Sequence, residues 1–292
     1  MFEDKWGSES HVTQSCEVTE VRCKFCGSTN TVKYGVRDQV QQYMCNDCGR
    51  KFTEKDTLEG KQTPVEEMGA AMSMYYDGLS LSAISRQLEG IYHDFVNPST
   101  IYRWIIQYSQ AAAMLLELYK AKVSTQWVVD ETVVGISGEN YWYWDVIDEG
   151  TRFLINTHLS RSRRIVDVVA LFQKCRMRTD VIPQTIISDK MSAYIDGIER
   201  VFGADTTHVQ SHGMASDTNI NLIERFHGTL KQRTKVMREL KSEDAARVIL
   251  DGFVVNYNFF RHHSALGDTT TPAQAAGIWL PFDTWEGLLR SL

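Results

Sequence analysis

The sequence has no long apolar run and no apolar leader. None of its apolar stretches reaches the roughly 18 residues that indicate a membrane-spanning helix. The first ten residues, MFEDKWGSES, also lack the basic start and apolar core of a secretory signal. We therefore expect a cytoplasmic protein with no membrane partner.

The chain also lacks a net positive charge. Its 292 residues include 31 lysines and arginines against 37 acids, which gives a formal charge of -6 and argues weakly against nucleic acid as a partner. A binding surface is local, however, and the total charge averages over the whole chain. Residues 225–238 contain no acid and five cations, namely Arg225, Lys231, Arg233, Lys235 and Arg238. Nucleic acid therefore stays open as a partner.

Cysteine is scarce, and four of the six cysteines form two C-x-x-C pairs. Residues 27–44 separate the pair Cys23 and Cys26 from the pair Cys45 and Cys48, which is the spacing of a four-thiolate zinc site. Two disulfides or a redox pair are the alternatives, and a cytoplasmic chain disfavours disulfides. We predict a flexible tail over residues 1–20 and a zinc ribbon with structural Zn²⁺ over residues 21–58. Cys16 and Cys175 have no partner spacing and are interpreted as ordinary thiols.

Residues 63–122 have the pattern of a helix, a short helix, a turn and a longer helix. Ser80 suits the start of the second helix, and Asn97 or Ser99 the start of the third, with Pro98 in its first turn. This layout is that of a helix-turn-helix, whose second helix of the pair reads DNA with its early residues. The expected contacts are Ser99, Thr100, Tyr102 and Arg103. For the helices, the alternative is a plain helical bundle. For the zinc ribbon, the alternative is a module that contacts protein only.

Residues 123–240 have a pattern of predicted strands and helices instead of helices alone. Three β-rich runs are followed by a helix, the short strand QTIISD, a helix, the short strand THVQ and a further helix. The order βββαβαβα predicts an α/β, ribonuclease-H-like core with a mixed five-stranded sheet. Residues 241–292 are expected to form a C-terminal helix and tail.

The helix predicted over residues 218–238 carries two stripes. One is apolar and suits a core, with Ile223, Phe226, Leu230 and Met237. The other places one carboxylate in line with cations, in Glu224, Lys231, Lys235 and Arg238. A carboxylate suits a hard divalent cation and neighbouring cations suit phosphate, so the helix indicates metal-dependent chemistry on nucleic acid. A solvated charged face is the alternative interpretation.

Two aspartates at strands complete a carboxylate set with Glu224. Asp130 lies in the first strand, and Asp189 follows the buried pair Ile186-Ile187 at a carboxyl strand end, where ligands gather in open sheets. Side chains alternate along a strand, so Asp130 and Glu131 should point to opposite faces and only one of them should join a given site. The three carboxylates are expected to hold one or two Mg²⁺ ions. Strand-end caps or solvated acids are the alternative for the two aspartates.

On these residues the chain resembles the DDE transposases of prokaryotic insertion sequences, and most closely the insertion-sequence-six family. The matching segments are WVVDET (127–132), LSRSR (159–163), ISDK (187–190), NLIERFHGTLK (221–231) and NYNFFRHHSALGDTTTPAQAAGI (256–278). The interval from Asp189 to Glu224 matches that of the family, as does a basic residue seven after the glutamate, here Lys231. His227 matches a family histidine, for which assistance to the site and a structural role are both open; His208 and His212 have no assignment.

The resemblance implies a catalytic set of Asp130, Asp189, Glu224 and Lys231, with two Mg²⁺ (or Mn²⁺) ions on the three acids. It implies cleavage at the element ends and attack of the freed 3′-hydroxyl on target DNA, with Lys231, Lys235 and Arg238 holding phosphates. It also implies a nucleoid-associated protein that works as a homodimer or higher assembly on DNA. A zinc-ribbon and helix-turn-helix regulator with an inactive core, and another ribonuclease-H-like nuclease, are the competing interpretations.

Overall fold

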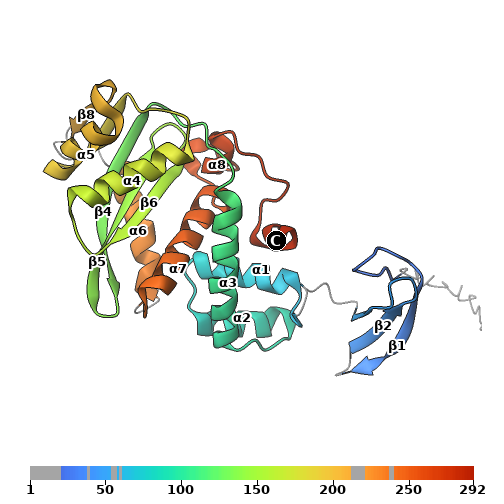
Figure 1. Ribbon diagram of the computed structural model, residues 1–292. Helices are drawn as coiled ribbons and strands as arrows, with labels where there is room; N and C mark the ends of the chain where they lie inside the picture. Colours follow the sequence, from blue (N-terminus) through green and yellow to red (C-terminus); the bar gives the residue numbers. More distant parts are fainter. Residues whose placement is uncertain (1–20, 38–39, 54–57, 59–60, 212–220, 237–239) are drawn as a thin grey trace, which may run out of the picture. The chain divides into compact units, whose positions relative to one another are not determined.

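The computed structural model describes residues 21–37, 40–53, 58, 61–211, 221–236 and 240–292. The chain divides into two compact units, Met1–Gln62 and Thr63–Leu292, which are described separately (Figure 1). The predicted tail 1–20, with Cys16, lies outside the described residues, as do His212, Met237 and Arg238. No helix in the described ranges is long and apolar enough to cross a membrane.

The first unit contains a small antiparallel sheet. Its strands lie in the order β1-β2-β3, with bounds β1 Thr31–Arg37, β2 Val40–Cys45 and β3 Lys51–Thr53. Its core consists of Cys23, Tyr43, Cys45 and Phe52, with Val21 packed against it. The rings of Tyr43 and Phe52 stack with their centroids 5.8 Å apart. Two of the four core residues are thus cysteines of the predicted zinc site.

Three helices open the second unit: α1 Val65–Tyr76, α2 Leu81–Tyr92 and α3 Pro98–Leu116. The predicted capping residues are found at their positions. Ser80 Oγ accepts a hydrogen bond from the amide of Ala83 at 3.3 Å, and Asn97 Oδ1 accepts one from the amide of Ser99 at 2.9 Å. Of the two candidates for the start of α3, the cap is therefore Asn97, and Pro98 occupies the first turn.

A five-stranded sheet forms the centre of the second unit. The strands are β4 Gln126–Ile136, β5 Glu139–Asp148, β6 Leu154–Ser160, β7 Thr185–Ser188 and β8 Thr207–Gln210. They lie in the order β6-β5-β4-β7-β8, antiparallel from β4 to β6 and parallel from β4 through β7 to β8. The predicted mixed sheet of a ribonuclease-H-like core is therefore confirmed by its strand order.

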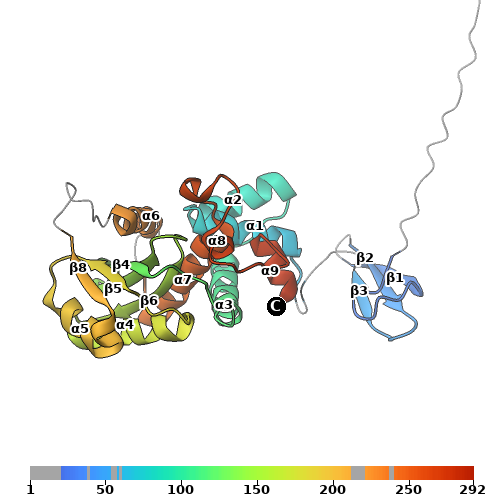
Figure 2. The same ribbon diagram turned by 90° about the horizontal axis from the view of Figure 1, so that it is seen from above.

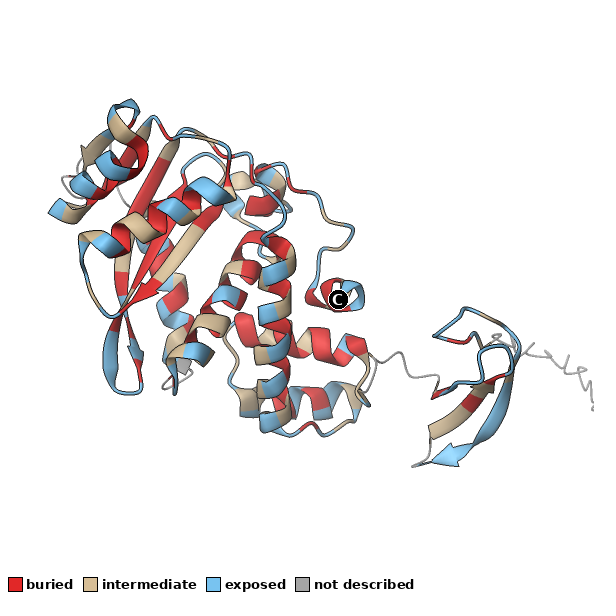
Figure 3. Ribbon diagram, in the orientation of Figure 1, coloured by how far each residue is buried: buried red, intermediate tan, exposed pale blue. Residues whose placement is uncertain are grey.

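Helices cover both faces of this sheet. Helices α4 Ile165–Arg178 and α5 Ser192–Phe202 lie on one face, and α6 Asn221–Val236 lies on the other (Figure 2). A short 3₁₀ turn, Gly203–Asp205, follows α5. Strands β4 to β7 are buried along most of their length (Figure 3), and Trp127, Trp144 and Phe172 are fully buried. The central strand β4 is thus covered on both sides.

The C-terminal segment packs on the first helices of the unit. It comprises α7 Glu243–Val255, a π-helical turn Asn256–Phe260, a 3₁₀ turn Ser264–Leu266, α8 Pro272–Ala275 and α9 Trp285–Ser291. Helix α7 packs on α3, and α9 packs on α1. A methyl group at Gly252 of α7 would lie 2.0 Å from Tyr76 Oη, so glycine is required for this approach. The ring of Tyr76 also stacks on Trp285 at 5.3 Å.

Candidate active site

Three carboxylates meet where β7 ends beside β4. Asp130, Glu131 and Asp189 each offer an oxygen, and these oxygens lie within 4.8 Å of one another. The register explains the meeting, because β4 and β7 run parallel with Val128 opposite Ile187. Two residues further along each strand, Asp130 and Asp189 therefore lie side by side. The structure brings these two predicted residues together.

The structure places the carboxylates of both Asp130 and Glu131 close to Asp189, where only one of the two was expected. Their side chains do alternate, since Asp130 approaches His227 of α6 and Glu131 accepts a hydrogen bond from Tyr194 of α5. However, β7 ends at Ser188, so no strand covers β4 on this side at residues 130 and 131. Both carboxylates reach around the open edge of β4 toward Asp189.

Asp130 is held in a chain of buried polar groups. His227 Nδ1 lies 3.6 Å from Asp130 Oδ2, and His227 Nε2 lies 2.8 Å from Asp145 Oδ2. Asp145 is fully buried and is the direct cross-strand neighbour of Asp130 on β5. Nothing in the sequence motifs singled out Asp145. Of the two roles open for His227, contact with the site is the one that its position favours.

Burial is the largest influence on the pKa values of Asp130, Asp145 and His227. It raises the pKa of Asp130 to about 7, with a contribution from Glu131 and an opposing one from His227. It also raises the pKa of Asp145 to about 6, against the hydrogen bond from His227. Burial lowers the pKa of His227, but the hydrogen bond and charge of Asp145 outweigh this, and the net shift is upward. The upward shift of the His227 pKa favours its imidazolium form, which lies between the carboxyl groups of Asp130 and Asp145.

A guanidinium lies on the other side of the acids. Arg163 contacts Glu131, and its Nη2 lies 3.5 Å from Asp189 Oδ2. The guanidinium carbon also lies 4.9 Å from the centre of the Trp142 ring. Sequence analysis included Arg163 only as the last letter of LSRSR. The acids thus attract a cation at the open edge of the sheet.

Glu224 is not part of this group of carboxylates. It occupies the first turn of α6 with an exposed side chain, while Ile223, Phe226 and Leu230 are buried as predicted. Its carboxylate is outside the set of oxygens that lie within 4.8 Å of one another. Lys231 and Lys235 are exposed further along the same helix.

One cation of the predicted basic stretch points inward. Arg233 is 3% exposed, and its guanidinium carbon lies 3.8 Å from the centre of the Tyr75 ring of α1. The local basic surface on α6 is therefore smaller than the sequence count indicates. Arg238 lies outside the described residues and adds nothing here.

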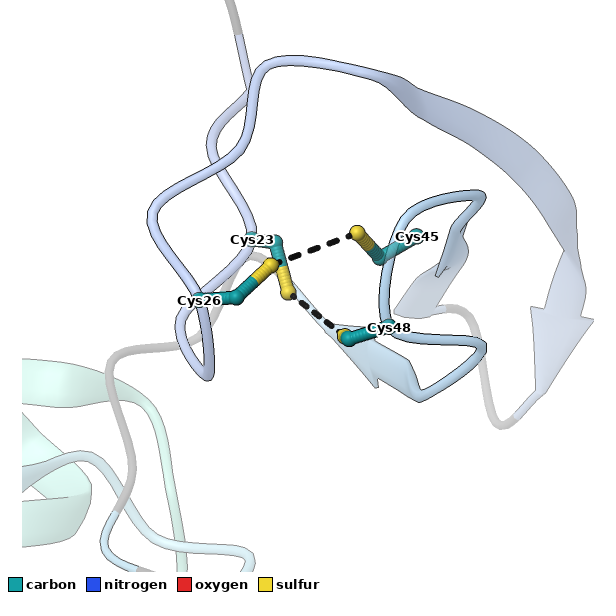
Figure 4. Close-up of side chains that lie close together, drawn as sticks. All are labelled: Cys23, Cys26, Cys45 and Cys48. Atoms are coloured by element: carbon teal, nitrogen blue, oxygen red, sulfur yellow. Dashed lines mark hydrogen bonds between the residues drawn. The ribbon is translucent and has the colours of Figure 1, made fainter.

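The four cysteines of the first unit converge on one point (Figure 4). The Cys23 and Cys48 sulfurs lie 3.6 Å apart, as do those of Cys26 and Cys45. A tetrahedral zinc ion with bonds of about 2.3 Å separates its sulfurs by about 3.8 Å, so the donors fit this ion. Gly27 and Gly49 adopt positive φ angles of 73° and 69°, which the turns around such a site require.

The first turn of α3 presents the residues predicted to contact DNA. Ser99 and Arg103 are exposed, and Thr100 and Tyr102 are partly exposed. Arg103 folds back along the helix, where its Nε donates to the Ser99 carbonyl and its Nη2 to Thr100 Oγ1, both at 3.2 Å. These contacts leave the guanidinium at the surface of the helix.

The structure also shows the surroundings of His208 and Cys175. His208 Nε2 lies 2.7 Å from Ser188 Oγ at the end of β7, and burial lowers the pKa of this histidine. Cys175 is fully buried in α4, and burial raises the pKa of its thiol, as suits an unreactive core thiol.

Comparison with known proteins agrees with this geometry. The family model of the IS240-type transposase DDE domain matches residues 124–263. The transposase of the insertion sequence-like element IS431mec of Staphylococcus aureus is 26% identical over 167 residues, which cover 57% of this chain and 71% of that protein. The transposase of insertion sequence IS257 in transposon Tn4003 of the same species matches with the same values.

Among solved structures, the integrase catalytic core domain of HTLV-2, a structure described as a complex with magnesium, is similar with a TM-score of 0.42. The sequence identity is 14%, over 54% of this chain and 99% of that domain. The fold assignment rests on the strand order and not on this likeness. The matched DDE domain contains the sheet, Asp130, Asp189 and Glu224, and these matches support a DDE transposase of the insertion-sequence-six family.

Proposed function

We propose that this transposase binds the ends of its insertion sequence and catalyses metal-dependent 3′-end cleavage, followed by strand transfer into target DNA. One observation carries the proposal. Asp130 and Asp189, from two separate strands, lie together at the open edge of β4, and Glu224 is exposed on the helix that covers this strand. Three acids from three elements are what a metal site for phosphoryl transfer needs.

The donors present suit Mg²⁺ or Mn²⁺. All are carboxylate oxygens, which hard divalent cations prefer, and their closeness leaves negative charge that attracts the Arg163 guanidinium. We assign Asp130, Asp189 and Glu224 as the ligands, with Glu224 reaching the other two by rotation of its exposed side chain. The bound metal supplies activation of water and stabilisation of the attacking and leaving oxygens.

The protein's own groups position the reactants. The His227 imidazolium, itself held by Asp145, fixes one oxygen of Asp130 and leaves the other free for the site. Lys231, two turns along α6 from Glu224, binds the phosphate that is cut, and Lys235 binds a phosphate next to it. Arg238 is assigned the same kind of contact from its place in the sequence.

Recognition of the ends is assigned to the N-terminal modules. Ser99, Thr100, Tyr102 and Arg103 at the start of α3 form the proposed DNA contacts, and Cys23, Cys26, Cys45 and Cys48 hold the structural Zn²⁺ of the ribbon. Target DNA and a second copy of the chain are the further partners we propose, with a homodimer or higher assembly on the ends.

The test is a cleavage and joining assay on a duplex that carries the labelled element end. With Mg²⁺ or Mn²⁺ the protein should release a strand with a free 3′-hydroxyl and join it to target DNA. Protein that shifts the same duplex in a gel but cuts it with neither metal would instead be a DNA-binding regulator with an inactive core. Cutting that does not depend on the end sequence would indicate a general nuclease.

A further inference from the structure

A cationic cavity lies beside the acids and has no role in the account above. Its volume is about 430 Å³, and it lies between α6, the turn that joins β5 to β6, and the segment that follows α7. Three guanidiniums and two imidazoles line it, from Arg152, Arg225, Arg261, His262 and His263, against the single carboxylate of Glu149. Phe226 and Tyr257 form an apolar wall. This composition suits an anion.

The arginines of this cavity have few acidic neighbours among the described residues, namely Glu149 in the wall and Asp77, whose pKa is raised by burial and lowered by the charge of Arg261. Within the residues that the structure describes, Arg152, Arg225 and Arg261 form no ion pair with an acid. His263 Nε2 is buried without a hydrogen-bond partner. Burial, together with the charges of Arg261 and Arg152, lowers the pKa of His263 to about 4, so its ring is neutral at pH 7. A ring nitrogen without a hydrogen-bond partner, among described arginines that form no ion pair, indicates a polar ligand.

The backbone around the cavity has two unusual features. Arg152 has a φ angle of 61°, in the left-handed region that is unfavourable for a residue with a side chain. Arg261 follows a π-helical turn, Asn256–Phe260, and such turns are frequent at functional sites. Local strain of this kind persists where the surrounding structure holds a side chain in a functional position. Both features place an arginine in the cavity wall.

The cavity is close to the acids along the chain and in space. Val128 lines it, and Val128 precedes Asp130 by two residues on the same face of β4, a distance of about 7 Å along a strand. Arg225 follows Glu224 directly on α6. A DNA strand whose cut phosphodiester lies at the acids therefore has a neighbouring phosphate within reach of the cavity.

We propose that this cavity binds a backbone phosphate of the DNA strand, within two nucleotides of the cut, on Arg152, Arg225 and Arg261. The proposal rests on the proposed function, because it takes the strand at the acids to be DNA. It assigns the cavity the role of fixing the direction in which the strand crosses the active site. Arg225 is the best residue for the test, since it is exposed on α6 and its removal leaves the core intact.

The experiment replaces one phosphate at a time by a neutral methylphosphonate in the element-end duplex, over two nucleotides on each side of the cut. Binding is measured without added Mg²⁺ or Mn²⁺ and without a chelator, so it does not depend on cleavage and the ribbon keeps its zinc. For the unaltered protein, one substituted position should lower affinity by roughly tenfold, the effect of losing one charge-assisted contact. Arg225→Gln should bind unmodified DNA roughly tenfold more weakly than the unaltered protein does. A methylphosphonate at the sensitive position should then lower the affinity of this variant only a little further.

The matched control is Arg200→Gln, which removes an exposed arginine from α5 on the opposite face of the sheet. It should respond to every methylphosphonate as the unaltered protein does. If Arg225→Gln and Arg152→Gln both keep the unaltered profile, the cavity does not hold a phosphate, although the proposed function stands. If the unaltered protein neither binds nor cuts the end duplex, the proposed function fails.

Discussion

Asp130→Asn should remove activity and, without metal, stabilise the fold in a pH-dependent way. Asp130 is 15% exposed at its side chain, and its pKa rises from 3.8 to about 7 on folding. Because the folded pKa lies above the unfolded one, the charged form is disfavoured by folding. The group's contribution to stability is thus complete below pH 4 and is lost as the pH rises to about 7.

The size of the effect follows from the shift. One pKa unit corresponds to 1.36 kcal/mol, so a shift of roughly three units, which already includes the opposing charge of His227, is about 4 kcal/mol. Asparagine does not titrate. We compare the free energy of unfolding of Asp130→Asn with that of the unaltered protein. The advantage of the variant should be about 2–4 kcal/mol larger at pH 8 than at pH 4.

The assay is urea unfolding in EDTA at both pH values, followed by the fluorescence of the tryptophans buried in the sheet core, such as Trp127 and Trp144. Asp196→Asn, at an exposed position of α5, is the control with the same change of charge. Added Mg²⁺ should stabilise the unaltered protein and not Asp130→Asn. A gap for Asp130→Asn that is equal at pH 4 and pH 8 would refute the reasoning.

Three further predictions concern other parts of the chain. Purified protein should contain about one zinc per chain by elemental analysis, and Cys45→Ser should lose the metal, unfold the ribbon and weaken end binding while the tryptophan fluorescence of the core is retained; zinc-free native protein would contradict this. Arg103→Ala should weaken binding equally on all sequences and reduce the salt slope by about one, measured by gel shift; unchanged binding at every salt concentration would exclude a contact. Arg163→Gln should raise the Mg²⁺ affinity in the absence of DNA several-fold, measured by calorimetry, because the guanidinium competes for Glu131 and Asp189; an unchanged affinity would show that it does not compete.

The fold was accessible from the sequence because each element has a local signal. The β-rich runs predict β4 to β6, and the apolar stripe of Ile223, Phe226 and Leu230 predicts α6. Asp189 was found because it directly follows a short buried strand. The meeting of Asp130 with Asp189 follows from two parallel strands. Glu131 was not expected beside Asp189, because the alternation of side chains along a strand gives only the face from which each side chain leaves the backbone. It does not tell how far a side chain extends at an open sheet edge.

The remaining site residues depend on register and on distant packing. Asp145 becomes the neighbour of Asp130 only once the turn of the β4–β5 hairpin is placed at Ser137-Gly138, two residues with positive φ. The cavity combines Arg152 with Arg261, more than a hundred residues apart, and no periodicity or spacing connects them. Such contacts exist only in the folded chain.

The most direct test of the central claim compares Glu224→Gln with the unaltered protein on one labelled element end, by cleavage and joining with Mg²⁺ beside a gel shift. Glutamine is nearly isosteric, and Ile223 and Phe226 still anchor α6, so the fold and end binding should persist. The metal loses a charged ligand, and cleavage should fall by orders of magnitude. Asp130→Asn and Asp189→Asn should behave alike, and a double change should be little worse than a single one, because the ligands act as a unit. Undiminished cleavage by Glu224→Gln would contradict the account and remove this residue from the site.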